Sequence, residues 1–177
     1  MNADLQSRLE KILAEPVKST TSVSGGCIAD SRKLELNSGK LFFLKLARRG
    51  NSDMFDSEAQ GLEELRKAAA VSVPEVVAKD TNFLLLEWIE EGGDSDDSSM
   101  EKLGFQFAEL HRFHGDKFGY LQENYLGDSP QINIPSSAGS ENWATFYAEN
   151  RLQFQAELAE KNGYATQEMR TLLDLLI

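Results

Sequence analysis

The stretch that decides the fold is residues 37–46, which read Asn-Ser-Gly-Lys-Leu-Phe-Phe-Leu-Lys-Leu. Its first three residues are typical of a hairpin turn. After Lys40, the six residues Leu41–Leu46 form a strongly apolar predicted strand, and Lys45 is its only charged residue. A lysine that faces the core from such a strand is costly unless it has a partner. Lys45 is therefore either an exposed residue of an alternating strand or a functional residue with an acidic neighbour.

Working outward, this strand is the third of a predicted antiparallel series. The glycine-bearing segment Ser24-Gly25-Gly26-Cys27 separates the first two strands. A helical period follows, in which Glu58 shares a face with apolar residues that should pack on the sheet. Glu58 is therefore expected to point toward Lys45. The predicted elements of this half are a helix over 4–14, strands over 18–23, up to Leu36 and over 41–46, a helix over 52–70, and strands over 76–77 and 83–86.

The second half has a different character. Residues 90–97 read Glu-Glu-Gly-Gly-Asp-Ser-Asp-Asp, an acidic segment without an apolar anchor that is typical of a linker. Ser98 and Glu101 form a capping-box pattern, which predicts a helix start. No strong strand signal follows, and we expect loops over 115–139. Further helices are predicted over about 142–161 and from about Thr166. We therefore predict an α+β fold with lobes over 1–90 and 98–177 and a linker over 91–97.

Composition narrows the function. The 177 residues include 18 Lys and Arg against 29 Asp and Glu, a net charge of −11. Such a chain is a poor partner for nucleic acid, whose phosphates need a basic surface. No apolar run is long enough for a membrane span, and the amino terminus lacks the pattern of a secretory signal. One cysteine excludes an internal disulfide and fits a reducing compartment, so we expect a cytoplasmic protein.

The order of these signals resembles the amino-terminal lobe of a protein-kinase-like fold. A glycine loop lies between strands one and two, a lysine on strand three, a glutamate on the next helix, and a fifth strand leads into a helical half. The glycines do not have the protein-kinase spacing, which favours small-molecule kinases. Several further segments resemble the fructosamine kinase (ketosamine 3-kinase) family: Gly25–Ile28, Phe43–Lys45, Met54–Ala59, Val73-Pro74, Leu103–Arg112, Phe118–Tyr120, Asn124–Asn133, Asn142–Tyr147 and Arg151–Gln153.

That resemblance implies ATP- and Mg²⁺-dependent phosphorylation of a ketosamine at its sugar 3-hydroxyl, which leads to deglycation. The substrate would be a small ketosamine or a glycated protein lysine. By position, Lys45 would hold the nucleotide phosphates and Glu58 would orient Lys45. The adenine hinge would comprise Glu87, Trp88 and Ile89, and the phosphate loop Ser24, Gly25 and Gly26. A glycine pair alone is more often a tight turn than a phosphate loop. Cys27 is the redox candidate, because the family has a cysteine at this place.

The resemblance also implies a catalytic loop of the form His-Gly-Asp that we do not find here. His114-Gly115-Asp116 has the sequence of that tripeptide, but it comes directly after the Leu103–Arg112 helix, which is too early in the chain for a catalytic loop. It also lacks the asparagine expected a few positions later. His111 and His114 are interpreted as a packed helix-end histidine and a loop histidine. We therefore expect the catalytic aspartate and the metal ligands beyond Ile177, and no turnover by residues 1–177 themselves.

Two alternatives stay open at this point. One is a phosphotransferase of the same fold that acts on an aminoglycoside or a choline-like alcohol. The other is a non-catalytic nucleotide-binding or interaction domain. The leucine-rich last helix would expose an apolar face, which makes a homodimer possible.

Overall fold

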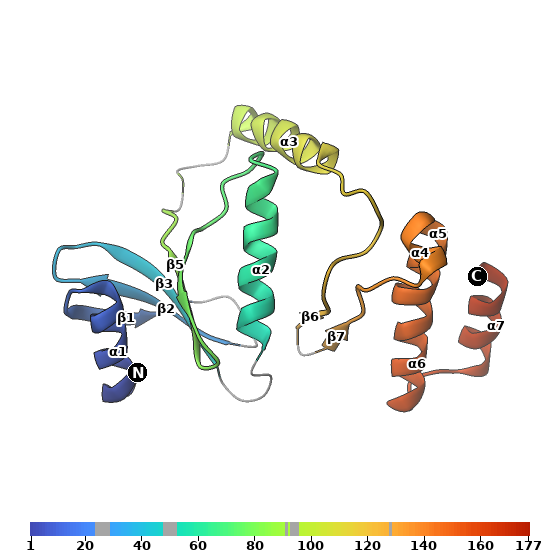
Figure 1. Ribbon diagram of the computed structural model, residues 1–177, viewed down its shortest axis with the longest axis horizontal. Helices are drawn as coiled ribbons and strands as arrows, with labels where there is room; N and C mark the ends of the chain where they lie inside the picture. The colour runs from blue at the N-terminus through green and yellow to red at the C-terminus, as the bar shows by residue number, and fades with distance from the viewer. Residues whose placement is uncertain (24–28, 48–52, 91, 93–95, 128) are drawn as a thin grey trace. The chain divides into compact units, whose positions relative to one another are not determined.

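The computed structural model describes residues 1–23, 29–47, 53–90, 92, 96–127 and 129–177 (Figure 1). The chain forms two compact units, Met1–Phe113 and His114–Ile177. The first unit contains a five-stranded antiparallel sheet in the order β1-β2-β3-β5-β4. The sheet and its helices confirm the predicted fold class. The strands are β1 (Val17–Ser22), β2 (Ala29–Leu36), β3 (Leu41–Ala47), β4 (Val76–Lys79) and β5 (Phe83–Glu87).

One face of the sheet packs against α1 (Ala3–Leu13). The helix begins where the Asn2 side chain accepts a hydrogen bond from Leu5 N at 2.9 Å, a normal N-cap. It ends at Ala14, whose φ of 54° is left-handed, just before Pro16. The core on this face is fully apolar and includes Leu9, Leu34, Leu36, Phe42, Leu44, Phe83 and Leu85.

The opposite face packs against α2 (Met54–Lys67), as Figure 1 shows. Phe55 and Ala59 are the buried residues of this helix, and they pack with Ala29, Leu84 and Leu86 of the sheet. Strand β5 is buried along both faces, so its near-continuous run of leucines suits a central position in a covered sheet.

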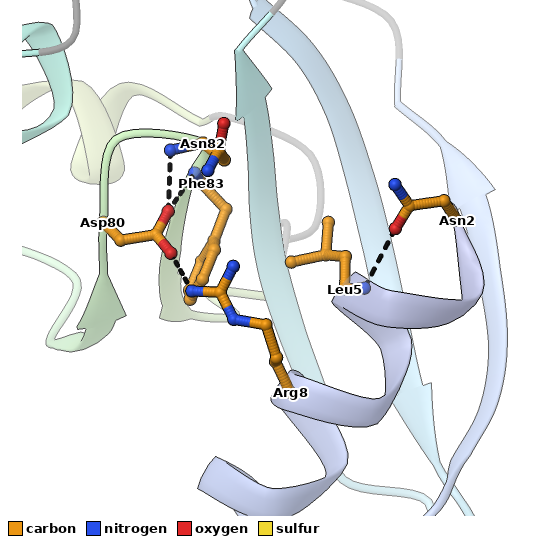
Figure 2. A network of polar contacts seen from close by, with 6 residues as sticks. All are labelled: Asn2, Leu5, Arg8, Asp80, Asn82 and Phe83. Carbon is orange, nitrogen blue, oxygen red and sulfur yellow. Dashed lines mark hydrogen bonds and ion pairs between the residues drawn. The ribbon is translucent and has the colours of Figure 1, made fainter.

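A polar network fastens α1 to the turn between β4 and β5 (Figure 2). Asp80 Oδ1 accepts hydrogen bonds from Asn82 N at 2.6 Å and Phe83 N at 3.1 Å. Its other oxygen forms an ion pair with Arg8. Arg8 also lies 5.7 Å from the centroid of the Phe83 ring. Partial burial works against ionisation of Asp80, but these hydrogen bonds prevail and hold the pKa of its carboxyl below the ordinary 3.8.

Helix α3 (Asp97–Arg112) starts earlier than the predicted capping box at Ser98 would place it. The N-cap is Asp96, whose side chain accepts from Ser99 N at 2.7 Å. The predicted capping box of Ser98 and Glu101 is therefore wrong, because the acidic side chain two residues earlier takes that role. None of the residues of α3 is buried.

The second unit holds a hairpin that the sequence analysis missed. It consists of β6 (Asn124–Leu126) and β7 (Ser129–Gln131). Three-residue strands are too short to show an alternating pattern, and Pro130 argues against a strand on propensity alone. Pro130 is tolerated because this two-stranded sheet consists of edges.

The predicted helix over 142–161 is really three consecutive segments. They are α5 (Trp143–Tyr147), a π-helical stretch (Ala148–Gln153) and α6 (Phe154–Lys161). A short helix, α4 (Ser137–Glu141), begins inside the region predicted as loop, and α7 (Gln167–Leu176) begins after its N-cap Thr166 as expected.

Asn133 ties the hairpin to the π-helical stretch. It is 3% exposed and donates from Nδ2 to Asn124 Oδ1 at 2.7 Å and to Gln122 O at 3.2 Å. Its Oδ1 accepts from Arg151 at 2.8 Å. Burial lowers the pKa of the Arg151 guanidinium, although the neighbouring Glu123 and Tyr147 oppose that shift. This buried polar side chain thus has partners for its donors and its acceptor, as a stable interior requires.

Candidate functional site

Lys45 lies on β3 opposite Ser31 of β2 and Leu84 of β5. Its Nζ is 2.7 Å from both carboxylate oxygens of Glu58 on α2. The predicted ion pair is therefore confirmed. Alternation along β3 explains it: Leu44 faces α1, so Lys45 must face α2.

The pair is partly withdrawn from water, with 24% of the Lys45 side chain and 31% of the Glu58 side chain exposed. Screening by solvent is weaker there than on an open surface. An ammonium has three donors, and two of them are directed at Glu58. The exposed part of the ammonium therefore keeps the capacity to bind an anion such as a phosphate oxygen.

The helix that carries Glu58 is held in place on both sides of that residue. Phe55 and Ala59 are 2% and 0% exposed, so they fix the helix against the sheet. Asp56 also forms an ion pair with Lys79 of β4. These contacts determine which helix face meets Lys45.

The predicted nucleotide hinge consists of Glu87, which ends β5, and of Trp88 and Ile89, which follow it. Glu87 is engaged with the chain entering β4: its N–H donates to Glu75 O at 2.9 Å and its carboxylate accepts from Glu75 N at 3.1 Å. Trp88 contacts Phe43, with ring centroids 6.4 Å apart. Ile89 is 49% exposed. The hinge role of these residues remains a prediction.

The predicted phosphate loop, Ser24, Gly25 and Gly26, lies outside the described residues, and so does the redox candidate Cys27. The described residues next to this segment show where it begins. Val23 N donates to Ser31 O at 2.9 Å, and Ser31 is the β2 neighbour of Lys45. The segment between β1 and β2 therefore starts close to the strand position that flanks Lys45.

Sequence reasoning did not single out Ser31, Lys33 or Phe43, which the sheet register brings onto the face that carries Lys45. Ser31 is 7% exposed, a rare buried polar side chain in this unit. Lys33 Nζ lies 4.7 Å from the Trp88 ring centroid. The available signal was the strict alternation of β3, which puts Phe43 and Lys45 on one face.

The second unit contains a cavity of about 670 Å³ between the hairpin, the π-helical stretch, α6 and α7. Its volume is in the range of small-molecule sites. The lining mixes apolar residues such as Leu126 and Met169 with charged residues such as Arg151 and Glu157. No catalytic carboxylate was predicted here, and the geometry does not assign one.

The two histidines lie where the chain leaves α3. His111 is in the last turn of that helix and its ring centroid is 4.5 Å from that of Phe107, although the residue itself is exposed rather than packed in a core. His114 and Asp116 are exposed and outside any helix or strand.

No helix among the described residues is long and apolar enough to cross a membrane.

Comparison with known proteins gives a consistent result. The fructosamine kinase family model matches residues 1–176. A "Probable ketoamine kinase" of Synechocystis sp. is 33% identical over 152 residues, which are 83% of this chain and 50% of the relative. A chloroplastic protein-ribulosamine 3-kinase of Oryza sativa subsp. indica is 34% identical over 152 residues, which are 82% of this chain and 42% of the relative. The chain thus spans about half the length of the curated relatives it matches.

A solved structure assigned as a fructosamine-3-kinase from Thermobifida fusca superposes with a TM-score of 0.84 at 24% identity, over 99% of this chain and 61% of that one. The structure of a gentamicin–APH(2")-IIa complex superposes with a TM-score of 0.56 at 15% identity, over 98% of this chain and 57% of that one. These likenesses establish the protein-kinase-like fold. With a family model that covers 1–176 and relatives at one-third identity, the chain belongs to the fructosamine kinase family.

Proposed function

We propose that this chain is the nucleotide-binding part of a kinase that transfers phosphate from ATP to the sugar 3-hydroxyl of a ketosamine, and that the product then releases its amine. The observation that carries the proposal is the bidentate contact between Lys45 and Glu58. A lysine held this way by a helix glutamate is the arrangement that positions nucleotide phosphates in kinase-like folds.

In this proposal each residue has a distinct role. Lys45 binds the phosphates with its remaining donor capacity, and Glu58 keeps the ammonium extended toward them. Residues 24–26 form the phosphate loop, and residues 87–89 border the base. Magnesium, which neutralises charge on the transferring group, would be bound by carboxylates other than Glu58, since both Glu58 oxygens are engaged by Lys45.

The substrate proposal rests on the relatives, whose names include ketoamine kinase and protein-ribulosamine 3-kinase. We propose a ketosamine, either free or on a protein lysine, and a cytoplasmic place of action for which the single cysteine is the support. Lobes over 1–90 and 98–177 with a linker over 91–97 are part of the same proposal. A net charge of −11 supports the expectation that nucleic acid is not a partner.

Calorimetric titration of residues 1–177 with ATP and Mg²⁺ tests the nucleotide site. We expect measurable binding that Lys45→Met weakens by about tenfold or more, because a charged hydrogen bond to phosphate is lost. Lys11→Met is the matched control, since Lys11 is an exposed residue of α1 on the other face of the sheet. Equal ATP affinity in the wild type and Lys45→Met would overturn the proposal.

A second assay addresses the reaction. Residues 1–177 are incubated with ATP, Mg²⁺ and fructosyl-lysine, and phosphate transfer is measured. We expect no turnover, because no catalytic aspartate was recognised in this chain. Turnover that Asp116→Asn abolishes would contradict that expectation and make Asp116 the catalytic carboxylate.

A further inference from the structure

Strand β4 lies at the edge of the sheet, next to β5, and it is connected to the helices on both faces. Its last residue, Lys79, forms an ion pair with Asp56 of α2. The next residue, Asp80, forms an ion pair with Arg8 of α1, which packs on the opposite face (Figure 2). Two successive residues at the end of this edge strand therefore link it to α2 and to α1.

Lys79 and Lys45 stand in one row across the sheet. Leu84 of β5 is the register partner of Lys45 on one side and of Lys79 on the other. Residues directly opposite each other on neighbouring strands share a face of the sheet, and Leu84 is buried in the core beneath α2. Both lysines are therefore on the α2 face, one on each side of Leu84.

The two acidic partners leave α2 on opposite flanks. Asp56 and Glu58 are two positions apart, which corresponds to about 200° around a helix axis. Phe55 and Ala59 of the same helix are buried against the sheet between them. One carboxylate is thus directed to Lys79 and the other to Lys45.

The spacing of the two lysines fits this arrangement. They lie on the two strands that flank β5, so their backbones are two strand spacings apart, about 10 Å. A helix with its side chains has a diameter of ~10–12 Å. The row is therefore wide enough for each lysine to reach one flank of the helix. We call the pairs Lys45–Glu58 and Lys79–Asp56 the α2 clamp.

We propose that Lys79 is a positioning residue for the Lys45–Glu58 pair and acts through Asp56 and the rotation of α2. Apolar contacts are non-directional, so Phe55 and Ala59 hold the helix down without fully fixing its rotation. Ion pairs on both flanks oppose each other and fix it. Without Lys79, α2 is held on one flank, and Glu58 orients the Lys45 ammonium less precisely.

The anchoring of Asp80 makes Lys79 suitable for this role. Asp80 Oδ1 accepts hydrogen bonds from Asn82 N and Phe83 N, so the turn that follows Lys79 has a defined backbone. Its other oxygen is bound to Arg8. The Lys79 side chain is 32% exposed, which leaves it partly shielded from solvent. An ion pair on a well-anchored backbone loses less entropy than one between two mobile surface residues.

The test measures ATP affinity, so this inference rests on the proposed function. Residues 1–177 and the variant Lys79→Met are titrated with ATP and Mg²⁺ by calorimetry. We expect Lys79→Met to weaken ATP binding by about two- to fivefold, the range that corresponds to one partly exposed ion pair. Lys79→Arg keeps the charge and should bind ATP as the wild type does. Lys79→Gln keeps a long polar side chain, so it serves if Lys79→Met fails to fold.

A double-mutant cycle with Glu58→Gln separates positioning from a general structural effect. If Lys79 acts through Glu58, then Lys79→Met should cost little further ATP affinity once Glu58 has been changed, less than about 1.5-fold, because coupled residues are not additive. A general structural effect would instead weaken ATP binding by the same factor in both backgrounds. That second result would overturn the proposal.

The matched control is Lys18→Met. Lys18 belongs to β1 at the other edge of the sheet and forms an ion pair with Glu35 of β2 at 2.7 Å. This variant also removes an ion pair of an edge-strand lysine, but one whose partner is not on α2. We expect wild-type ATP affinity. Equal losses in Lys18→Met and Lys79→Met would refute a specific role for Lys79.

The outcomes separate the two proposals. If Lys45→Met loses ATP binding while Lys79→Met binds ATP as the wild type does, the positioning role is refuted and the proposed function stands. If Lys45→Met binds ATP normally, the phosphate position and the inference built on it are both refuted.

Discussion

Lys45 and Glu58 meet at 2.7 Å through both carboxylate oxygens, although one lies on a strand and the other on a helix thirteen residues further along the chain. Each is next to a fully buried residue, Leu44 and Ala59 respectively. The apolar core therefore fixes the backbone positions, and the ion pair follows from them. An ion pair of this exposure contributes little to stability by itself, so its value lies in orienting the ammonium.

Removing the charge of Glu58 tests that orienting role. We expect Glu58→Gln to weaken ATP binding by about three- to tenfold and to shift the unfolding free energy by less than about 1 kcal/mol. The matched control is Glu63→Gln, an exposed residue of the same helix. Calorimetry and chemical unfolding measure the two quantities. An ATP affinity in Glu58→Gln equal to that of the Glu63 control would refute the orienting role.

The second prediction concerns Asp80, whose carboxylate receives two backbone N–H groups and Arg8 (Figure 2). Its pKa is lowered in the folded state, so the carboxylate stabilises the fold above the ordinary pKa of 3.8 and loses that contribution as the pH falls through the lower folded value. We expect Asp80→Asn to cost roughly 1–2 kcal/mol at neutral pH.

Urea unfolding from pH 7 to pH 3 checks the sign. The difference between the wild type and Asp80→Asn should be constant near neutrality and should shrink toward the acid end. Glu63→Gln serves again as the carboxylate control. A difference that grows as the pH falls would show that Asp80 does not stabilise the fold as an ionised carboxylate.

At Gly119 an added side chain would meet a close obstacle. Its φ is +96°, and a Cβ there would lie 2.6 Å from Asn133 O and 2.8 Å from Pro135 Cδ. Gly163 also has a positive φ, of +75°, but a Cβ there meets nothing within 4 Å. We expect Gly163→Ala to cost about 1 kcal/mol through backbone strain alone. Gly119→Ala should cost clearly more, about 3 kcal/mol, because strain and overlap add.

Thermal unfolding of the two glycine variants in a Trp88→Phe background, in which Trp143 of the second unit is the remaining tryptophan, measures the difference. Trp143 belongs to that unit and packs against Phe118 and Phe146. Equal melting temperatures for the two variants would mean that the close approach of residues 119 and 133 does not restrict position 119.

Cys27 is the only cysteine, so any disulfide it forms must join two chains. We expect mild peroxide to produce a dimer band on a non-reducing gel and Cys27→Ser to abolish it. A thiolate near free N–H dipoles is more oxidisable. Persistence of the band in Cys27→Ser would exclude a disulfide as its cause.

The strands β1 to β5 and α2 were predictable because their signals are local and strong. The run Leu41–Leu46 has apolar residues on both faces, and only a covered strand tolerates that. Glu58 was predictable as the partner of Lys45 because helical spacing puts it on the face of Met54 and Leu62. Those two periodicities were enough to place one acid and one base of the site.

The hairpin of β6 and β7 and the π-helical stretch were not predictable from such patterns. The hairpin depends on Asn133, whose buried side chain takes partners from residues 122, 124 and 151. A polar residue in a loop-like sequence carries no sign of burial until its partners are assembled. The same applies to Arg151 of the π-helical stretch, which donates hydrogen bonds to Ile132 O and Asn133 Oδ1.

The sequence by itself therefore determined which segments form the strands and helices of the first unit, and that Lys45 and Glu58 face each other. Alternation along a strand and the helical repeat are properties of neighbouring residues. The sequence motifs also identified the family. Only the tertiary structure decided the register that brings Lys33 beside Phe43 and places Trp88 against both. Register depends on how buried faces of several strands fit together, and a shift of one residue would turn each of these side chains to the other face.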